Sequence, residues 1–216
     1  MKKMIPIFTL IFLFAFGLAG CSSDEPVAIV NDEEILESVY NETLDRMKRL
    51  YEAQIDFESE QGQTFLTQLE ENVLDMLIQQ RVIFQAAKAE GYLVPMSEIE
   101  LEFNAIRDSF ESETEFEAAL EENVLTAERF KESLQQDATI EAYFEARLDI
   151  EPVTEEDVIA FYDEQLALAE EAGQELPELD EVFTLIENEL ADRRQQEAAS
   201  AIVDQLMAAA TIERLR

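Results

Sequence analysis

The sequence predicts a mainly α-helical protein with one short β-pair that could join its two ends. Apolar residues recur at three- and four-residue spacings through most of the 216 residues, which is the period of an amphipathic helix. Ser or Thr followed three positions later by Glu marks two helix starts. Short β-favouring runs stand near the two ends of the chain, at residues 27–30 and 211–216.

The first patterned segment, VAIV at 27–30, predicts a strand, and Asn31-Asp32 predicts a turn after it. From Glu33 the spacing becomes helical and indicates one helix that continues to about Ile55. Its expected apolar face comprises Ile35, Val39, Leu44, Met47, Leu50, Tyr51 and Ile55.

A second, more apolar helix is expected from Phe65 to Ala87. Gly91 should end it, because glycine readily adopts the left-handed conformation that closes a helix. Pro95 then holds the preceding residue extended.

Four further helices are predicted from the residues that would cap their first turns. Two of these starts should be capping boxes, in which a Glu side chain returns the hydrogen bond. The expected caps are Ser97 with Glu100, Thr114 with Glu117, Thr126, and Thr154 after Pro152.

The joint Gly173–Pro177 separates these helices from a long last helix that carries apolar residues from Leu179 to Leu206. Residues 211–216 alternate and could form a strand that pairs with residues 27–30. Because an isolated two-stranded ribbon is marginally stable, this pair would have to lie on the helices.

The N-terminus has the pattern of a secretory signal. A basic start, MKKM, precedes a short apolar run that ends in LAGC at residues 18–21. The LAGC sequence resembles the lipobox of bacterial lipoproteins, in which Cys21 would be lipidated and become the new N-terminus. The alternative is an ordinary secretory signal beside a cysteine. We therefore expect residues 1–20 to be a signal peptide and 21–26 a lipidated tether to an extracytoplasmic membrane surface.

The expected mature chain is strongly acidic, with 13 basic and 50 acidic residues and a net charge of −37. Such a surface repels nucleic acid, so nucleic-acid binding is excluded. Residues 148–192 contain sixteen Asp or Glu and no Lys or Arg. One interpretation is adaptation to high salt or high pH. The other is an acidic docking surface for a basic partner.

The composition also excludes most catalytic sites. The chain has no histidine, and its one cysteine is Cys21, so Ser/His and Cys/His nucleophile systems and a zinc site are not expected. Neighbouring carboxylates are frequent, but adjacent residues of a helix point in different directions and rarely share one site. Since no EF-hand spacing occurs, we expect no metal and no cofactor.

The order of the segments resembles the N-terminal chaperone domain of the SurA/PrsA-type peptidyl-prolyl isomerases, which is related in fold to the C-terminal part of trigger factor. The segments that carry the resemblance are VAIVNDEEI, LDMLIQQRVIFQAAKAEGYLVPMSEIELEFNAIRDSF, SETEFEAALEENVLTAERFKESLQQDATIEAYF, EPVTEEDVIAFYDE and FTLIENELADRRQQEAASAIVDQLMAAATIERLR. The resemblance implies one elongated helical chaperone domain over residues 27–216. Its N-terminal lobe, 27–172, would be completed by the helix and strand of 178–216.

The resemblance also implies what this chain lacks. In that family a parvulin-type isomerase domain is inserted between the helix that resembles VTEEDVIAFYDE and the returning C-terminal helix. Here only the joint at 172–177 occupies that interval, and the histidines of parvulin sites are missing. We therefore expect no prolyl isomerase activity.

The implied function is to bind unfolded or newly secreted polypeptides close to the membrane. Aromatic side chains on the shorter middle helices are the candidate client-binding residues: Tyr92, Phe103, Phe110 and Phe116. The alternative for each is packing in the core. The negative charge could also favour basic clients. A second functional hypothesis is a lipoprotein adaptor whose acidic helical surface docks one specific protein.

Overall fold

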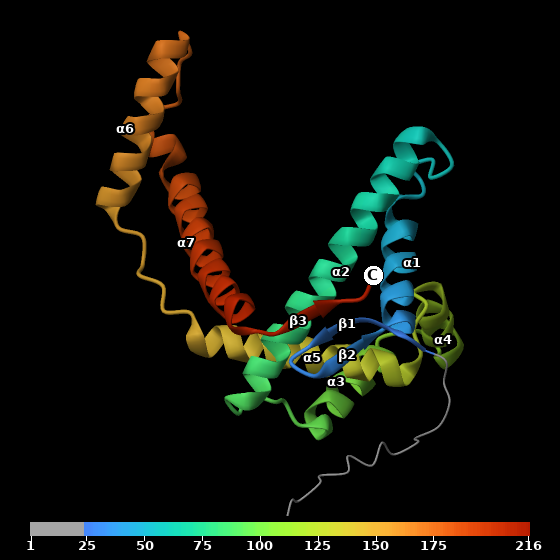
Figure 1. Cartoon of the computed structure of the whole chain (residues 1–216). Coiled ribbons are helices and arrows are strands. Elements are labelled where there is room, and N and C mark those ends of the chain that lie inside the picture. Colours follow the sequence, from blue (N-terminus) through green and yellow to red (C-terminus); the bar gives the residue numbers. More distant parts are fainter. Residues whose placement is uncertain (1–23) are drawn as a thin grey trace, which may run out of the picture.

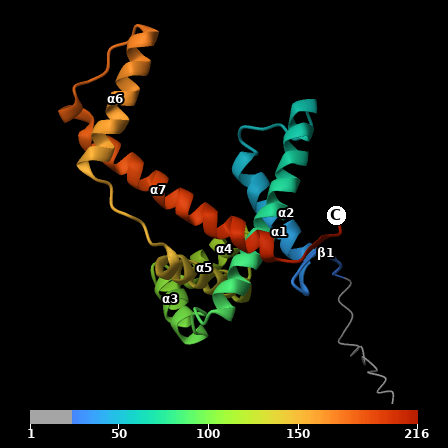
Figure 2. The same ribbon diagram turned by 60° about the vertical axis from the view of Figure 1, so that its left-hand side comes forward.

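The computed structural model describes residues 24–216, so the predictions for residues 1–20 and Cys21 lie outside the described residues. The described chain is mainly helical, with a small antiparallel sheet formed by its two ends (Figure 1). This confirms the predicted fold class. Two helical hairpins project from a body that contains the sheet and the shorter helices (Figures 1 and 2).

The sheet has three strands, β1 (Pro26–Val30), β2 (Glu33–Leu36) and β3 (Ile212–Arg214), in the order β2-β1-β3. β3 pairs antiparallel with β1, with Ala28 opposite Arg214 and Val30 opposite Ile212. The predicted pairing of the two chain ends is therefore confirmed.

β2 corrects the prediction that a helix begins at Glu33. Asn31 and Asp32 have φ values of 48° and 70°, the left-handed conformation that a two-residue hairpin turn requires. β2 consequently folds back on β1, with Glu33 opposite Val30. Its Ile35 is buried in the core, and the helix begins only after Leu36.

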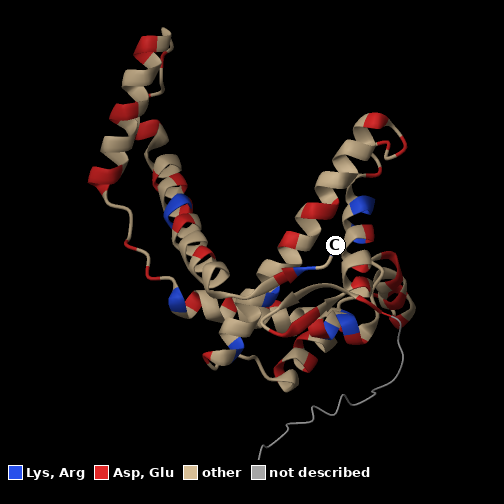
Figure 3. Ribbon diagram, viewed as in Figure 1, with Lys and Arg blue, Asp and Glu red and all other residues tan. Residues whose placement is uncertain are grey.

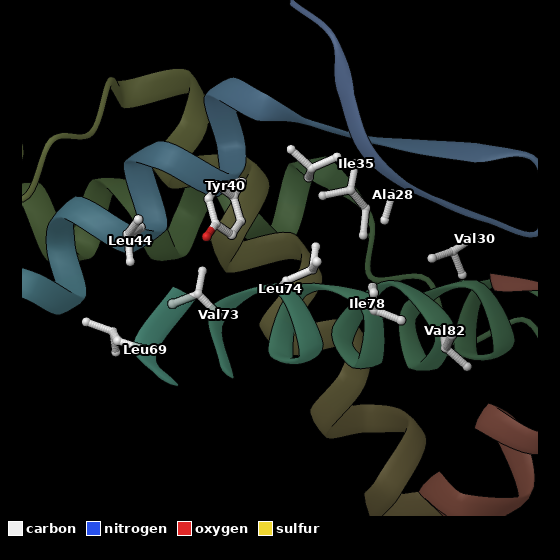
Figure 4. Close-up of a cluster of buried hydrophobic side chains, with 11 residues drawn as sticks. Ala28, Val30, Ile35, Tyr40, Leu44, Leu69, Val73, Leu74, Ile78 and Val82 are labelled. Atoms are coloured by element: carbon white, nitrogen blue, oxygen red, sulfur yellow. The ribbon is translucent and has the colours of Figure 1, made fainter. Parts of the chain in front are cut away.

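The first arm is the hairpin of α1 (Glu37–Tyr51) and α2 (Glu60–Ala89). The Ser59 hydroxyl caps α2 by accepting a hydrogen bond from the backbone N–H of Gly62. The main core lies between α1, α2 and the sheet (Figure 4). Its labelled members are Ala28, Val30, Ile35, Tyr40, Leu44, Leu69, Val73, Leu74, Ile78 and Val82.

The body contains α3 (Met96–Asp108), α4 (Glu113–Glu122) and α5 (Ala127–Arg147). The predicted cap at Thr126 is confirmed, since its hydroxyl accepts from the N–H of Arg129.

The predicted caps at Ser97 and Thr114 are wrong. α3 begins after Pro95 with no side-chain cap, because proline sets an extended backbone immediately before the first turn. α4 is capped two residues earlier than predicted. The Ser112 hydroxyl accepts from the N–H of Glu115, and the Glu115 carboxylate accepts from the N–H of Glu111.

The second arm is the hairpin of α6 (Glu155–Ala172) and α7 (Leu179–Ala209). Thr154 caps α6 as predicted, in a complete capping box with Asp157. Gly173 ends α6 with a left-handed φ of 69°. The C-terminal part of α7 packs against α2, where Ile202, Val203 and Leu206 join a second core cluster.

Candidate functional site

The two arms are the most extended features of the molecule. They rise from the same side of the body and diverge towards their tips (Figure 1). α6 packs principally on α7, and the upper part of α1 packs on α2, so each arm is a two-helix hairpin with most of its surface in solvent. A segment of another polypeptide could therefore reach side chains on both arms.

Both arms expose large apolar side chains. Leu50, near the end of α1, is 66% exposed, and Leu185 of α7 is 67% exposed. Surfaces that bind unfolded chains need such side chains, because covering apolar area is the main non-directional source of affinity. The exposed large hydrophobic residues on the arms are Leu50, Tyr51, Ile159, Leu168, Leu176 and Leu185.

Two of the four aromatic candidates lie in the interior of the body. Phe103 is 7% exposed and Phe116 is 4% exposed. Their rings meet edge to face at 5.5 Å, and both contact Phe130 at ring separations of 5.9 and 6.4 Å. In the folded chain these two phenylalanines are core residues that hold α3, α4 and α5 together.

The other two candidates keep part of their rings exposed. Phe110 is half-buried beside Phe116, with ring centroids 5.4 Å apart. Tyr92 is half-buried against Tyr143 at 5.5 Å. The structure therefore does not gather the four candidates into one site: three share the α3–α5 cluster and Tyr92 lies at the end of α2.

The aliphatic residues of the arms were not among the candidates predicted from the sequence. Leu185 precedes the buried Ile186 and so stands beside the apolar stripe of α7. Leu50 and Tyr51 were predicted on the apolar face of the first helix, but they are 66% and 37% exposed at the end of α1. For Leu185 the one available signal was its displacement from the stripe, which is weak because single exposed leucines are common.

Charge is distributed unevenly over the two arms. The upper part of the second arm shows acidic residues and no basic ones (Figure 3). α1 of the first arm carries Arg46, Lys48 and Arg49 close to its exposed Leu50. A bound segment would thus meet a mixed surface on one arm and a strongly negative surface on the other.

The shifted ionisable groups are structural. The Thr154 side chain and backbone hold the pKa of Asp157 below its usual range, with a smaller contribution from Arg194. Burial raises the pKa of Tyr143, whose hydroxyl donates to the Glu90 carboxylate at 3.3 Å. Both side chains link elements of the fold: Asp157 caps α6 and pairs with Arg194 of α7, and Tyr143 of α5 bonds to Glu90 at the end of α2.

Two features are absent from residues 24–216, the part of the chain that the structure describes. Within this range no three His, Cys, Asp or Glu side chains converge as metal ligands would. Nor does any helix of the same range combine the length and apolar character that a membrane span requires.

The architecture is that of an elongated helical domain with two arms, in which a small sheet pairs the N- and C-terminal strands. The sequence profile of the SurA-like N-terminal domain matches residues 1–143. The chain belongs to this family, as the order of its segments predicted. It is also 28% identical over 176 residues to the foldase protein PrsA of Caldanaerobacter subterraneus subsp. tengcongensis. That alignment covers 76% of this chain and 52% of the relative, so the chain matches about half the length of that protein.

Proposed function

We propose that this chain is a membrane-anchored extracytoplasmic chaperone that holds unfolded or newly secreted polypeptides and lacks prolyl isomerase activity. The observation that carries the proposal is the presence of exposed apolar side chains on both arms of a SurA-like N-terminal domain. The similarity to a protein named as a foldase supports the same role.

The arms suit weak and reversible capture. A dissociation constant of about 1 μM corresponds to about −8 kcal/mol, whereas burying one leucine fully contributes roughly 1.5–3 kcal/mol. Ordering a flexible client also costs free energy. A client must therefore cover several of the exposed residues together, and it leaves when folding withdraws its own apolar segments.

Tyr92 and Phe110 are proposed as additional contacts. Each is half-buried and packs on a neighbouring ring, so packing restrains the side chain without enclosing it. A ring held in this way loses little conformational entropy on binding.

We propose the absence of isomerase activity because only a short joint connects the two helices of the second arm. α6 ends at Ala172 and α7 begins at Leu179, so six residues connect them. The barrier to proline isomerisation is about 20 kcal/mol, and lowering it requires a formed pocket around the twisted amide. The chain also has no histidine with which to build a parvulin-type site.

The membrane anchor is proposed at Cys21, with residues 21–26 as its tether. The end of this tether lies on the folded body, since the N–H of Ser38 donates to the Asp24 carboxylate at 2.9 Å. β1 begins at Pro26, so at about 3.5 Å per residue the folded domain of 27–216 would lie within roughly 20 Å of the lipid surface. At this distance the domain would meet newly secreted polypeptides as they emerge from the membrane.

Light scattering of a denatured protein diluted into buffer tests the chaperone proposal. Residues 22–216 should suppress aggregation more than an equally acidic helical protein does, since charge alone keeps some aggregates soluble. Suppression no greater than that of the acidic control, by a fragment that circular dichroism shows to be folded, would overturn it.

A second candidate is an adaptor that docks one folded protein on the acidic second arm. The observation that favours it is the stretch 148–192, which carries sixteen acidic and no basic residues. An adaptor should bind one folded basic protein and leave denatured proteins unprotected, so the same assay separates the two functions.

A further inference from the structure

Arg194 of α7 lies where the second arm leaves the body, and its guanidinium group contacts three other groups. Its Nη2 is 2.9 Å from Oδ1 of Asp157, in the first turn of α6. Its Nη1 donates to the carbonyl oxygens of Pro152 at 2.9 Å and Glu151 at 3.2 Å. One side chain of α7 therefore holds both the start of α6 and the segment 148–154 that connects α5 to α6.

Asp157 is itself held in place. Its Oδ2 accepts hydrogen bonds from the backbone N–H of Thr154 at 2.8 Å and from the Thr154 hydroxyl at 2.7 Å. Its Oδ1 remains directed at Arg194. The two carboxylate oxygens thus join the cap of α6 to α7.

Arg194 lies on the part of α7 that extends beyond the packed core. α7 packs on the core through Ile202, Val203, Leu206 and Met207. At about 1.5 Å per residue, the part of α7 before Ile202 extends roughly 35 Å from the body, and Arg194 lies roughly 12 Å along it. Two segments connect the body to the second arm: α7 and the connector 148–154. Arg194 of α7 contacts the connector and so joins the two segments.

The charge of the arm makes this contact distinctive. Among residues 24–216, the pair of Arg194 with Asp157 is the one ion pair formed by the sixteen acidic residues of 148–192. Arg193, the next cation, lies over the Phe161 ring at 5.8 Å. The arm would otherwise be repelled by the acidic body.

We propose that Arg194 is the positioning residue of the second arm: it braces α6 and the 148–154 connector against α7 and so fixes the separation of the two arms. That this separation determines how a client is held rests on the proposed chaperone function. The planar fork of arginine can reach a carboxylate and two carbonyls together, which the single ammonium of lysine cannot.

Electron spin labels on the two arm tips test the brace. Cys21 is the single cysteine, so the full chain with Cys21→Ser accepts labels at introduced cysteines replacing Gln61 of α2 and Gln174 after α6, both of which are exposed. Arg194→Gln should give a broader distance distribution shifted to longer values, and Arg194→Lys should restore only part of the narrow distribution. Arg107→Gln is the matched control, since Arg107 pairs with its neighbour Asp108 on α3.

A distribution for Arg194→Gln that coincides with that of Arg107→Gln would overturn the brace. If Arg194→Gln does not fold, Asp157→Asn replaces it. That variant keeps the two carbonyl contacts and should broaden the distribution by a smaller amount, and an unchanged distribution would again overturn the brace.

The client assay separates this inference from the proposed function. The distance measurement needs no client, so it stands even if the unsubstituted chain fails to suppress aggregation, which would count against the chaperone function alone. If the unsubstituted chain suppresses aggregation, Arg194→Gln should suppress it less than Arg107→Gln does. If Arg194→Gln changes the arm separation but suppresses aggregation as well as Arg107→Gln does, arm position does not determine how a client is held.

Discussion

At the scale of single residues, burial separates two roles that the aromatic side chains could have. Phe103 and Phe116 lie on the apolar stripes of their own helices, and both are enclosed by α3, α4 and α5. Phe110 contacts the same cluster and keeps part of its ring exposed. Substitution of the buried Phe116 should therefore affect mainly the stability of the fold, and substitution of Phe110 mainly client binding.

Phe116→Ala should destabilise the fold by about 3–5 kcal/mol, because it removes a buried ring and leaves a cavity. Phe110→Ala should destabilise the fold less than Phe116→Ala does. Its main effect should be weaker client binding. Denaturant unfolding followed by circular dichroism measures the first effect, and aggregation suppression under conditions where both variants are folded measures the second. Equal destabilisation by both substitutions would contradict the assignment.

The sequence predicted these positions as apolar and aromatic but could not say which rings face inward. The periodicity of a helix defines a stripe, whereas burial depends on which neighbouring helix covers each part of it. Phe103 is covered by both Phe116 and Phe130, residues 13 and 27 positions away along the chain. The exposed Leu185 was missed for the same reason: its position beside the stripe of Ile186 does not say whether another helix covers it.

At the scale of elements, most helices were predictable, while two starts and one strand were not. Thr126 and Thr154 cap their helices as expected, because each hydroxyl has no closer competitor. In the segment Ser112–Glu115, however, two hydroxyl residues lie close to the start of α4, Ser112 just before the helix and Thr114 in its first turn. Ser112 is the cap because its backbone is extended, with φ −155° and ψ 158°, while Thr114 is already helical.

Alanine substitutions distinguish these two caps. Ser112→Ala should cost about 1 kcal/mol of stability, because the N–H of Glu115 loses its acceptor. Thr114→Ala is the matched control and should leave the free energy of unfolding nearly unchanged. Thermal unfolding of both variants checks this, and a larger loss for Thr114→Ala would show that the cap lies there.

β2 was missed because four residues are too few for periodicity to separate a strand from a helical turn. The deciding signal was the Asn31-Asp32 turn. Both residues adopt positive φ, which returns the chain on itself rather than releasing it into a helix. Pairing with β1 then takes precedence over the local helical pattern of Glu33–Leu36.

The α6 capping box predicts a pH dependence. Hydrogen bonds from Thr154, aided by Arg194, keep the pKa of Asp157 in the folded chain below the value of about 3.9 expected when unfolded. The contribution of the ionised carboxylate is therefore complete above about pH 4 and is lost as the pH falls through the lowered folded-state value.

Comparison with Asp157→Asn isolates this contribution from the titration of the other acidic residues. The substituted chain should be less stable than the unsubstituted chain at pH 7, and the difference should shrink as the pH falls below about 4. Denaturant unfolding at a series of pH values measures it. A stability difference that stays constant down to pH 2.5 would contradict the role of the ionised carboxylate.

At the scale of the whole molecule, the pairing of β1 with β3 closes the chain into one unit. The N–H of Asn31 donates to the Thr211 carbonyl at 2.9 Å, and the N–H of Leu215 donates to the Val27 carbonyl at 2.9 Å. The sequence allowed this pairing to be predicted because two β-favouring runs stood near opposite ends of a helical chain. The divergence of the arms could not be predicted, since it depends on contacts between segments distant in the sequence, such as the docking of α7 on α2.

The proposed function requires that the arms hold unfolded clients through their exposed apolar residues. The most direct test is the affinity of the chain for a permanently unfolded, fluorescently labelled polypeptide, comparing Leu50→Ser/Leu185→Ser with Leu101→Ser. Leu101 is 72% exposed, but it lies on α3 of the body.

We predict micromolar binding by the unsubstituted chain and by Leu101→Ser, and binding roughly tenfold weaker by the arm variant, equivalent to about 1.4 kcal/mol. Absence of binding by the unsubstituted chain, or equal weakening by Leu101→Ser, would contradict the claim.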